Sequence, residues 1–186
     1  MALPVHLGLF LSLLLPVLIC SSLASAFSVP VTMEVKKPGK VVICGAGVIG
    51  ANIAYQLSKR GVTSTIIDRI GTAPAASGKA GGFLALDWSD GTAIGPLSRK
   101  SFALHEELAK ELKLKSYRRL TCSAIAVDGG GKPLSKKLAA VEWADLGAVA
   151  ERKMGGEDTI AQVHPKELTE ALVREATAAG CTLRVG

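Results

Sequence analysis

The sequence has few cysteines, and their spacing excludes the common cysteine-based frameworks. The four cysteines are isolated from one another, and none forms a C-x-x-C pair. No group of Cys and His residues has the spacing of a zinc site, and no Ser-His-Asp order is recognisable. We therefore expect neither a disulfide framework nor a metal site, and the sequence assigns no catalytic residue.

Charged residues are missing from the first 26 positions. The apolar run "LGLFLSLLLPVLIC" is followed by "SSLASA", which ends in the A-x-A pattern of a cleavage site. This pattern predicts a secretory signal peptide over residues 1–26, cleaved near Ala26 before Phe27, and a linker over residues 27–39. The basic N-terminal residues of a typical signal are absent, so a membrane anchor is the alternative. Pro16 interrupts a run that is barely long enough to span a membrane, so we expect no stable span after cleavage.

The four letters "ASAF" at this junction allow a second interpretation of localisation. They resemble the signal-cleavage motif of plastid-targeted proteins in algae with secondary plastids, where Phe begins a transit segment. Secretion and plastid import therefore both remain expectations.

The excess of positive charge is spread among acidic residues. The chain has 22 Lys and Arg against 16 Asp and Glu, a net charge of +6, and segments such as "RKSFALHEELAKELKLKSYRR" mix the two signs. Such mixing is typical of the solvated face of an amphipathic helix. We expect no nucleic-acid partner, although the overall field favours anionic ligands.

A β-α-β unit occupies about thirty residues. "KVVIC" (40–44) is a short β-branched run typical of a buried parallel strand, and apolar residues recur at helical spacing from Val48 to Arg60. "STIID" (64–68) follows as a second strand. This order predicts an α/β, Rossmann-like fold in which helices flank a parallel sheet.

Three glycines follow the first strand in the order G-x-G-x-x-G and lead into the helix. Gly45 permits the tight turn, Gly47 lets the backbone approach a diphosphate, and Gly50 allows close packing of the helix on the sheet. The helix N-terminus offers free N–H groups and a partial positive charge. Asp68 ends the second strand 18 residues after Gly50 (68 − 50), where an acceptor for a ribose hydroxyl is expected. That carboxylate disfavours NADP, but these residues alone do not separate NAD from FAD.

The remaining elements are predicted from periodicity and from helix-end signals. "GTAPAASGKAGGFLA" (71–85) is rich in small residues and is predicted to be a loop. We expect helices over residues 96–112, 138–150 and 165–179, and strands over 123–127 and 181–185. His105 is predicted to lie on a helix surface, and His164 to make a local hydrogen bond at a helix start.

A second small-residue cluster, "AASGKAGGFLA", follows the second strand after only a few positions. Together with "VVICGAGVIGANIAYQLSKRGVTSTIIDR" and "DTIAQVHPKELTEALVREATAAGCTLRVG", it resembles the FAD-dependent oxidoreductases of the D-amino-acid oxidase (DAO) family, which includes glycine oxidase. The resemblance extends over roughly residues 40 to 186. It is most specific at the two ends of this range.

The resemblance implies that two segments and one acidic residue hold FAD. The first segment would bind the diphosphate, Asp68 the adenosine ribose with Arg69 beside it, and the second segment would line the diphosphate and flavin. The first segment comprises Gly45, Ala46, Gly47, Val48, Ile49 and Gly50, and the second comprises Ser77, Gly78, Lys79, Ala80, Gly81 and Gly82.

The resemblance also implies a function, namely oxidation of a C–N bond in a small amine or amino acid by hydride transfer to FAD. Family members are about twice as long, so residues 40–186 would form an FAD-binding domain that is incomplete at its C-terminus and lacks most of the substrate domain. Two alternatives stay open: a non-catalytic or unstable nucleotide-binding fragment, and an NAD-dependent dehydrogenase. The oligomeric state is not predicted.

Overall fold

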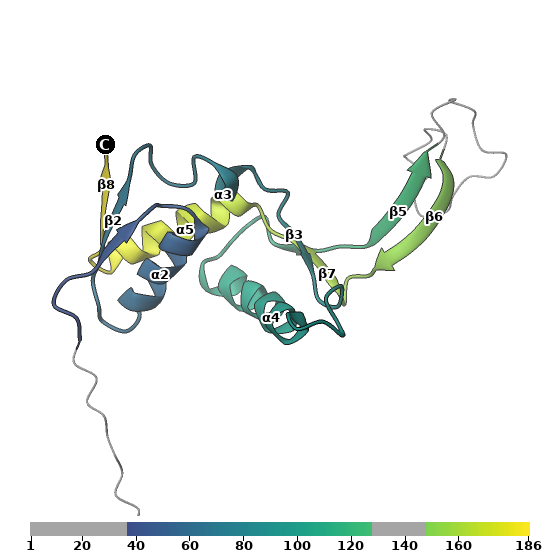
Figure 1. Cartoon of the computed structure of the whole chain (residues 1–186), viewed down its shortest axis with the longest axis horizontal. Coiled ribbons are helices and arrows are strands. Elements are labelled where there is room, and N and C mark those ends of the chain that lie inside the picture. The colour runs from purple at the N-terminus through teal and green to yellow at the C-terminus, as the bar shows by residue number, and fades with distance from the viewer. Residues whose placement is uncertain (1–36, 128–147) are drawn as a thin grey trace, which may run out of the picture. The chain divides into compact units, whose positions relative to one another are not determined.

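The computed structural model describes residues 37–127 and 148–186. The strands of the β-α-β unit belong to a three-stranded parallel sheet (Figure 1). Its strands are β1 (Val42–Cys44), β2 (Thr65–Asp68) and β8 (Thr182–Val185), in the order β1-β2-β8. Ile43 of β1 lies beside Ile66 of β2, and Ile66 lies beside Leu183 of β8. The expected parallel sheet is therefore present, with the second strand in its centre.

Two helices, α2 (Val48–Ser58) and α5 (Pro165–Ala178), pack against this sheet (Figure 1). Ala51 and Ala54 of α2 are fully buried, and so is Leu172 of α5. Small residues on α2 let the two helices approach each other closely while both cover Ile43 and Ile66. Burial of this apolar face is the main source of stability for the β-α-β unit.

The segment from 71 to 85, predicted to be a loop, contains two short elements. One helical turn, α3 (Ala76–Lys79), is followed by the strand β3 (Phe83–Ala85). β3 pairs antiparallel with β7 (Ile160–Gln162), which also pairs with β4 (Arg118–Arg119). The loop prediction was wrong for these residues, because β3 is stabilised by a partner strand about 80 positions away and not by its own sequence.

A long helix, α4 (Gly95–Glu111), confirms the helix expected over residues 96–112. Two strands of an antiparallel hairpin follow: β5 (Cys122–Val127) confirms the expected strand, and β6 (Ala148–Gly155) pairs with it. Residues 148–150 thus lie in a strand and not in the helix predicted over 138–150. The pairing with β5 decides their conformation, and residues 138–147 lie outside the described part of the chain.

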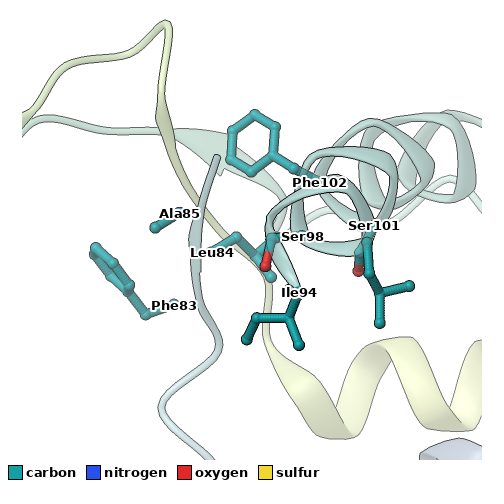
Figure 2. A pocket seen from close by; sticks show the side chains of 8 residues that line it. Phe83, Leu84, Ala85, Ile94, Ser98, Ser101 and Phe102 are labelled. Carbon is teal, nitrogen blue, oxygen red and sulfur yellow. The ribbon is translucent and has the colours of Figure 1, made fainter. Parts of the chain in front are cut away.

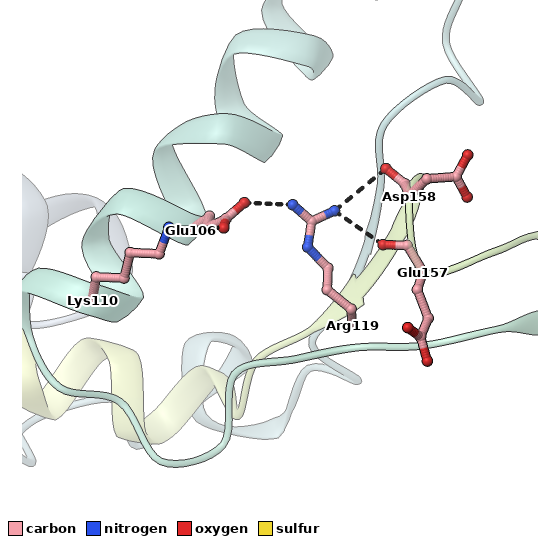
Figure 3. Close-up of polar contacts among 5 residues, drawn as sticks. All are labelled: Glu106, Lys110, Arg119, Glu157 and Asp158. Atoms are coloured by element: carbon pink, nitrogen blue, oxygen red, sulfur yellow. Dashed lines mark hydrogen bonds and ion pairs between the residues drawn. The ribbon is translucent and has the colours of Figure 1, made fainter.

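Arg119 connects α4 to the turn between β6 and β7 (Figure 3). Its guanidinium is paired with Glu106 on α4, and it donates hydrogen bonds to the backbone carbonyls of Glu157 and Asp158 at 3.3 and 3.4 Å. Lys110 donates to the other oxygen of Glu106 at 2.9 Å. Hydrogen bonds from Lys110 and Arg119 lower the pKa of Glu106, so this carboxylate is ionised at neutral pH.

We expect Arg119→Gln to lower the melting temperature of the chain by about 3 °C, because it removes the ion pair and both carbonyl contacts. The substitution also removes the guanidinium from its position 4.6 Å from the centre of the Phe102 ring. Arg118→Gln is the matched control, because Arg118 is exposed and its guanidinium donates to Gln162 and not to any partner of Arg119. Equal shifts of the two variants in differential scanning calorimetry would contradict this role of Arg119.

Some sequence predictions lie outside the described residues. These are the signal peptide over 1–26, its cleavage near Ala26, and the linker as far as residue 36. Within residues 37–127 and 148–186, no helix combines the length and apolarity needed to cross a membrane. The same residues contain no cluster of three or more His, Cys, Asp or Glu side chains suited to a metal ion.

Candidate dinucleotide-binding site

The turn between β1 and α2 has the backbone geometry that its glycines predict. Gly45 has a φ of +102°, in the left-handed region that side chains disfavour, and its N–H donates to the carbonyl of Ile67 at 2.7 Å. Gly47 is the N-cap of α2 and contributes no side-chain cap. In the first helical turn the N–H of Val48 donates to Ser77 Oγ, whereas the N–H groups of Ile49 and Gly50 have no acceptor inside the helix and are available to an anion.

Gly50 lies where no side chain fits. A Cβ atom at this position would be 2.0 Å from the carbonyl oxygen of Gly45 and 3.1 Å from Cγ2 of Ile43. The glycine therefore permits contact between the start of α2 and the turn, as its place in the motif predicts.

Asp68, at the end of β2, faces the same turn. Its Oδ2 accepts a hydrogen bond from the N–H of Ala46 at 2.9 Å, and its Oδ1 accepts from the N–H groups of Ile70 and Gly71 at 2.8 and 3.0 Å. An ionised carboxylate has about four acceptor positions, so three amides leave room for one further donor. The carboxylate thus ties the first turn to the segment after β2 and can still accept from a ligand hydroxyl.

These amides change the acidity of Asp68. The hydrogen bond from Ala46, followed by those from Ile70 and Gly71, lowers the pKa of Asp68 from 3.8 to about 2. The side chain is a permanent anion at physiological pH. It therefore acts as an acceptor, as recognition of a sugar hydroxyl requires, and it disfavours a phosphate at the same position.

The second small-residue segment lies directly against the first turn. The Oγ of Ser77, on α3, accepts a hydrogen bond from the N–H of Val48 at 3.0 Å. The N–H of Ala73 donates to the carbonyl of Ala46 at 3.0 Å, and a Cβ on Gly47 would be 3.0 Å from Ser77 Oγ. The two segments, 29 positions apart at Val48 and Ser77, therefore meet at the N-terminus of α2.

The glycines of the second segment have two different environments. Gly78 and Gly82 are in close backbone contact: an added Cβ would lie 2.1 Å from the carbonyl oxygen of Ala73 and 1.9 Å from that of Val163, respectively. A Cβ on Gly81 would instead have no heavy atom within 4 Å. Three residues of this segment and one after β2 are exposed, namely Lys79, Ala80, Gly81 and Arg69.

An apolar cavity of about 370 Å³ lies beyond this segment, between β3 and α4 (Figure 2). Figure 2 shows Leu84 of β3 directed toward Ser98 of α4, with Phe83 on the other side of the strand. Two serine hydroxyls, of Ser98 and Ser101, are the only side-chain polar groups among its lining residues. The cavity can receive an apolar group but supplies no side chain that titrates near neutral pH.

The two histidines among the described residues differ in how well the sequence predicted them. His164 is the N-cap of α5, and its Nδ1 accepts from the N–H of Glu167 at 3.3 Å, in the manner predicted. His105 is half-buried and its Nδ1 lies 2.8 Å from the carbonyl oxygen of Ser101, so the predicted surface position is only partly correct.

Two features of the site could not be found in the sequence. Ala73 is buried, has a φ of 52° and bonds the first turn, yet no motif marks it. The hydrogen bond from Val48 to Ser77 likewise depends on the fold of the segment between them. The one sequence signal was the high content of small residues between Val48 and Ser77, near Ser77, which is typical of a segment that approaches another backbone closely.

The arrangement fits a dinucleotide. A diphosphate can approach the amides at the start of α2, because Gly45 and Gly47 place no side chain over them. Asp68 accepts from the Ala46 amide of the same turn and keeps an acceptor position for a sugar hydroxyl.

Comparisons with known proteins identify a matching family and similar structures. Residues 40–186 match the family model described as FAD dependent oxidoreductase, DAO. A Schizosaccharomyces pombe protein that carries the name of an oxidoreductase is 32% identical over 147 residues, which cover 74% of this chain and 38% of the yeast protein.

Two solved structures have a similar fold. Glycine oxidase from Geobacillus kaustophilus matches with a TM-score of 0.60 and 25% identity, covering 78% of this chain and 46% of that one. L-Amino acid deaminase from Proteus myxofaciens, solved with anthranilate, matches with a TM-score of 0.59 over 80% of this chain and 38% of its own. At 22% identity, the second match shows likeness of fold alone. The chain spans less than half the length of each of these relatives.

Proposed function

Because the chain belongs to the DAO family of FAD dependent oxidoreductases, we propose that it forms the FAD-binding part of an enzyme that oxidises a C–N bond in a small amine or amino acid. The observation that carries the proposal is the meeting of the two small-residue segments at the N-terminus of α2, through the hydrogen bond from Val48 to Ser77. A single turn would suit many nucleotides. Two converging backbone segments suit an extended dinucleotide.

Each part of the site has a proposed role. The amides of Gly47, Ile49 and Gly50 would bind the diphosphate, since the other three amides of the turn already donate within the protein. Asp68 would accept a hydroxyl of the adenosine ribose. Lys79 and Arg69 are exposed cations near the two segments and would add to the attraction of the anionic cofactor. When bound, FAD supplies the oxidising power that removes a hydride from the carbon bearing the nitrogen.

The described residues position the cofactor and do not perform acid–base chemistry in this proposal. The cavity between β3 and α4 is lined by apolar residues and two serines, and it would exclude water from one side of the site. The chain covers 46% of the solved glycine oxidase, so substrate binding and turnover are proposed for the whole enzyme.

The family match bears differently on the two alternative functions. The NAD-dependent dehydrogenase is not supported, because the family match is to FAD dependent oxidoreductases. A non-catalytic nucleotide-binding protein would use the same turn and the same Asp68, and only turnover separates it from the proposed enzyme.

We expect the purified full chain to bind FAD stoichiometrically and to discriminate against smaller flavins. In a fluorescence titration, FMN should bind at least about tenfold more weakly than FAD, because it lacks the second phosphate and the ribose that Asp68 would bind. NAD should also bind more weakly than FAD, because it lacks the flavin ring. A chain that binds NAD but refuses FAD would overturn the proposal.

Turnover is tested separately. Addition of glycine or a primary amine to the FAD-loaded whole enzyme under anaerobic conditions should bleach the visible flavin absorbance. Tight FAD binding by the whole enzyme without bleaching by any amine would favour the non-catalytic alternative.

A further inference from the structure

One face of the helix α4 is exposed (Figure 1). Its central residues are Lys100, Ala103, Leu104 and Glu107, and all four are exposed. Lys100 and Glu107 are two helical turns apart, and the other two residues lie between them, so the four form one stripe on the helix. Phe102, on the opposite face of α4, is buried. We call the four exposed residues the α4 stripe.

A groove of about 600 Å³ between α2 and α4 adjoins the stripe at Leu104. Four aliphatic side chains line it, together with two amide side chains and Arg60. Ile49 and Ile53, on the α2 side, are 75% and 47% exposed, and Leu104 is 39% exposed. Exposed aliphatic side chains that gather on one surface are typical of a contact with another molecule.

The two charges of the α4 stripe have opposite signs and are seven positions apart. Neither Lys100 nor Glu107 forms an ion pair with a residue of the ranges 37–127 and 148–186. Glu111, one turn further along α4, is already paired with Lys59 at 2.6 Å. The stripe therefore presents one cation and one anion that no described residue neutralises.

The α4 stripe is complementary to a copy of itself. Two α4 helices can lie antiparallel about a twofold axis that passes between Ala103 and Leu104. Lys100 of each copy then lies opposite Glu107 of the other, because the two residues are equally far from the axis along the helix. The small side chain of Ala103 lies opposite Leu104 of the other copy and leaves room for it. No like charges of the stripe lie opposite each other in this arrangement.

We propose that the α4 stripe and the adjoining groove form a contact surface for a second copy of this chain. The contact is symmetric, with two ion pairs between Lys100 and Glu107, and Leu104 of each copy covers aliphatic side chains of the other. Such a small contact forms a reversible dimer, with a dissociation constant on the order of 10 μM. It uses none of the amides of the FAD turn and does not depend on the proposed function.

Sedimentation velocity of the full chain tests the dimer. The chain should sediment mainly as a dimer at about 100 μM and mainly as a monomer at about 1 μM, since these concentrations lie about tenfold above and below the expected constant. A monomer across the whole range would overturn the proposal and leave this face to another partner, such as the remaining part of a longer enzyme. Larger oligomers without a dimer would also overturn it, because a twofold contact is closed.

Charge reversal separates this contact from association through any other surface. Lys100→Glu and Glu107→Lys should each weaken the dimer about tenfold or more, because both ion pairs become contacts between like charges. An equimolar mixture of the two variants should regain the affinity of the unsubstituted chain, because every pair then joins a lysine to a glutamate. Lys40→Glu, which changes the net charge equally at an exposed site outside α4, should have no effect. A mixture that stays monomeric, or an equal loss in Lys40→Glu, would contradict the proposed contact.

The aliphatic part of the contact is tested at Leu104. Leu104→Gln should weaken the dimer by about fivefold, because the contact no longer covers an aliphatic side chain. Ile125→Gln is the matched control, since Ile125 on β5 is 41% exposed, close to the 39% of Leu104. This control should leave the affinity unchanged. Equal affinities of the two variants, both folded by circular dichroism, would show that Leu104 lies outside the interface and would overturn the proposal.

Discussion

Gly50→Ala is expected to destabilise the folded chain by about 3 kcal/mol or more and to abolish FAD binding. The added Cβ would lie 2.0 Å from the carbonyl oxygen of Gly45, a backbone atom that cannot rotate away. Relief of this overlap requires α2 to move off β1, which would open the contact with Ile43 and displace the amides proposed to bind the diphosphate. Urea unfolding followed by circular dichroism measures the first effect, and flavin fluorescence measures the second.

Gly39→Ala is the matched control for this prediction. An added Cβ at Gly39 meets no heavy atom within 4 Å, and Gly39 is not among the described residues with positive φ. Its urea midpoint and FAD affinity should equal those of the unsubstituted chain. If Gly50→Ala behaved like Gly39→Ala, the close packing of α2 on the turn would be wrong.

Asp68→Asn is expected to weaken FAD binding by about tenfold or more, with little change in the size of the protein side chain. Three amides donate to the carboxylate of Asp68, and an amide group offers only one oxygen to accept them. The side-chain NH₂ of Asn would then face one of these N–H groups, and two donors cannot form a hydrogen bond. The turn would lose one hydrogen bond to β2, and the proposed acceptor for the ribose would lose its charge. Asp90→Asn, whose carboxylate pairs with Arg99, should leave FAD affinity unchanged.

Asp68 should also contribute to the acid stability of the chain. Its folded pKa of about 2 lies below the ordinary value of 3.8, so its stabilising contribution is fully present above pH 3.8 and is lost as the pH falls toward 2. Urea midpoints measured between about pH 5 and pH 2 should therefore fall less steeply for Asp68→Asn than for the unsubstituted chain. Parallel slopes would show that the three amides do not stabilise the anion.

Local sequence predicted the β-α-β unit and the position of its carboxylate. The strands, the α2 helix and the 18-residue spacing to Asp68 depend on neighbouring residues, on apolar periodicity and on the conformational freedom of glycine. The same local signals placed α4 and α5 almost to the residue. They failed for residues 148–150 and for β3, where strand pairing with distant residues overrides local preference.

The amino-acid sequence by itself determined the glycine turn that is proposed to bind the diphosphate, because its glycines act through their own backbone and the helix that follows supplies the amides. Only the tertiary structure decided which residues complete the site. Ser77 bonds Val48, and Ile53 and Leu104 line one groove, because packing of α2, α3 and α4 brings together positions that no local pattern links. A motif is a short-range property of the chain, whereas a complementary surface depends on contacts between segments that are distant in sequence.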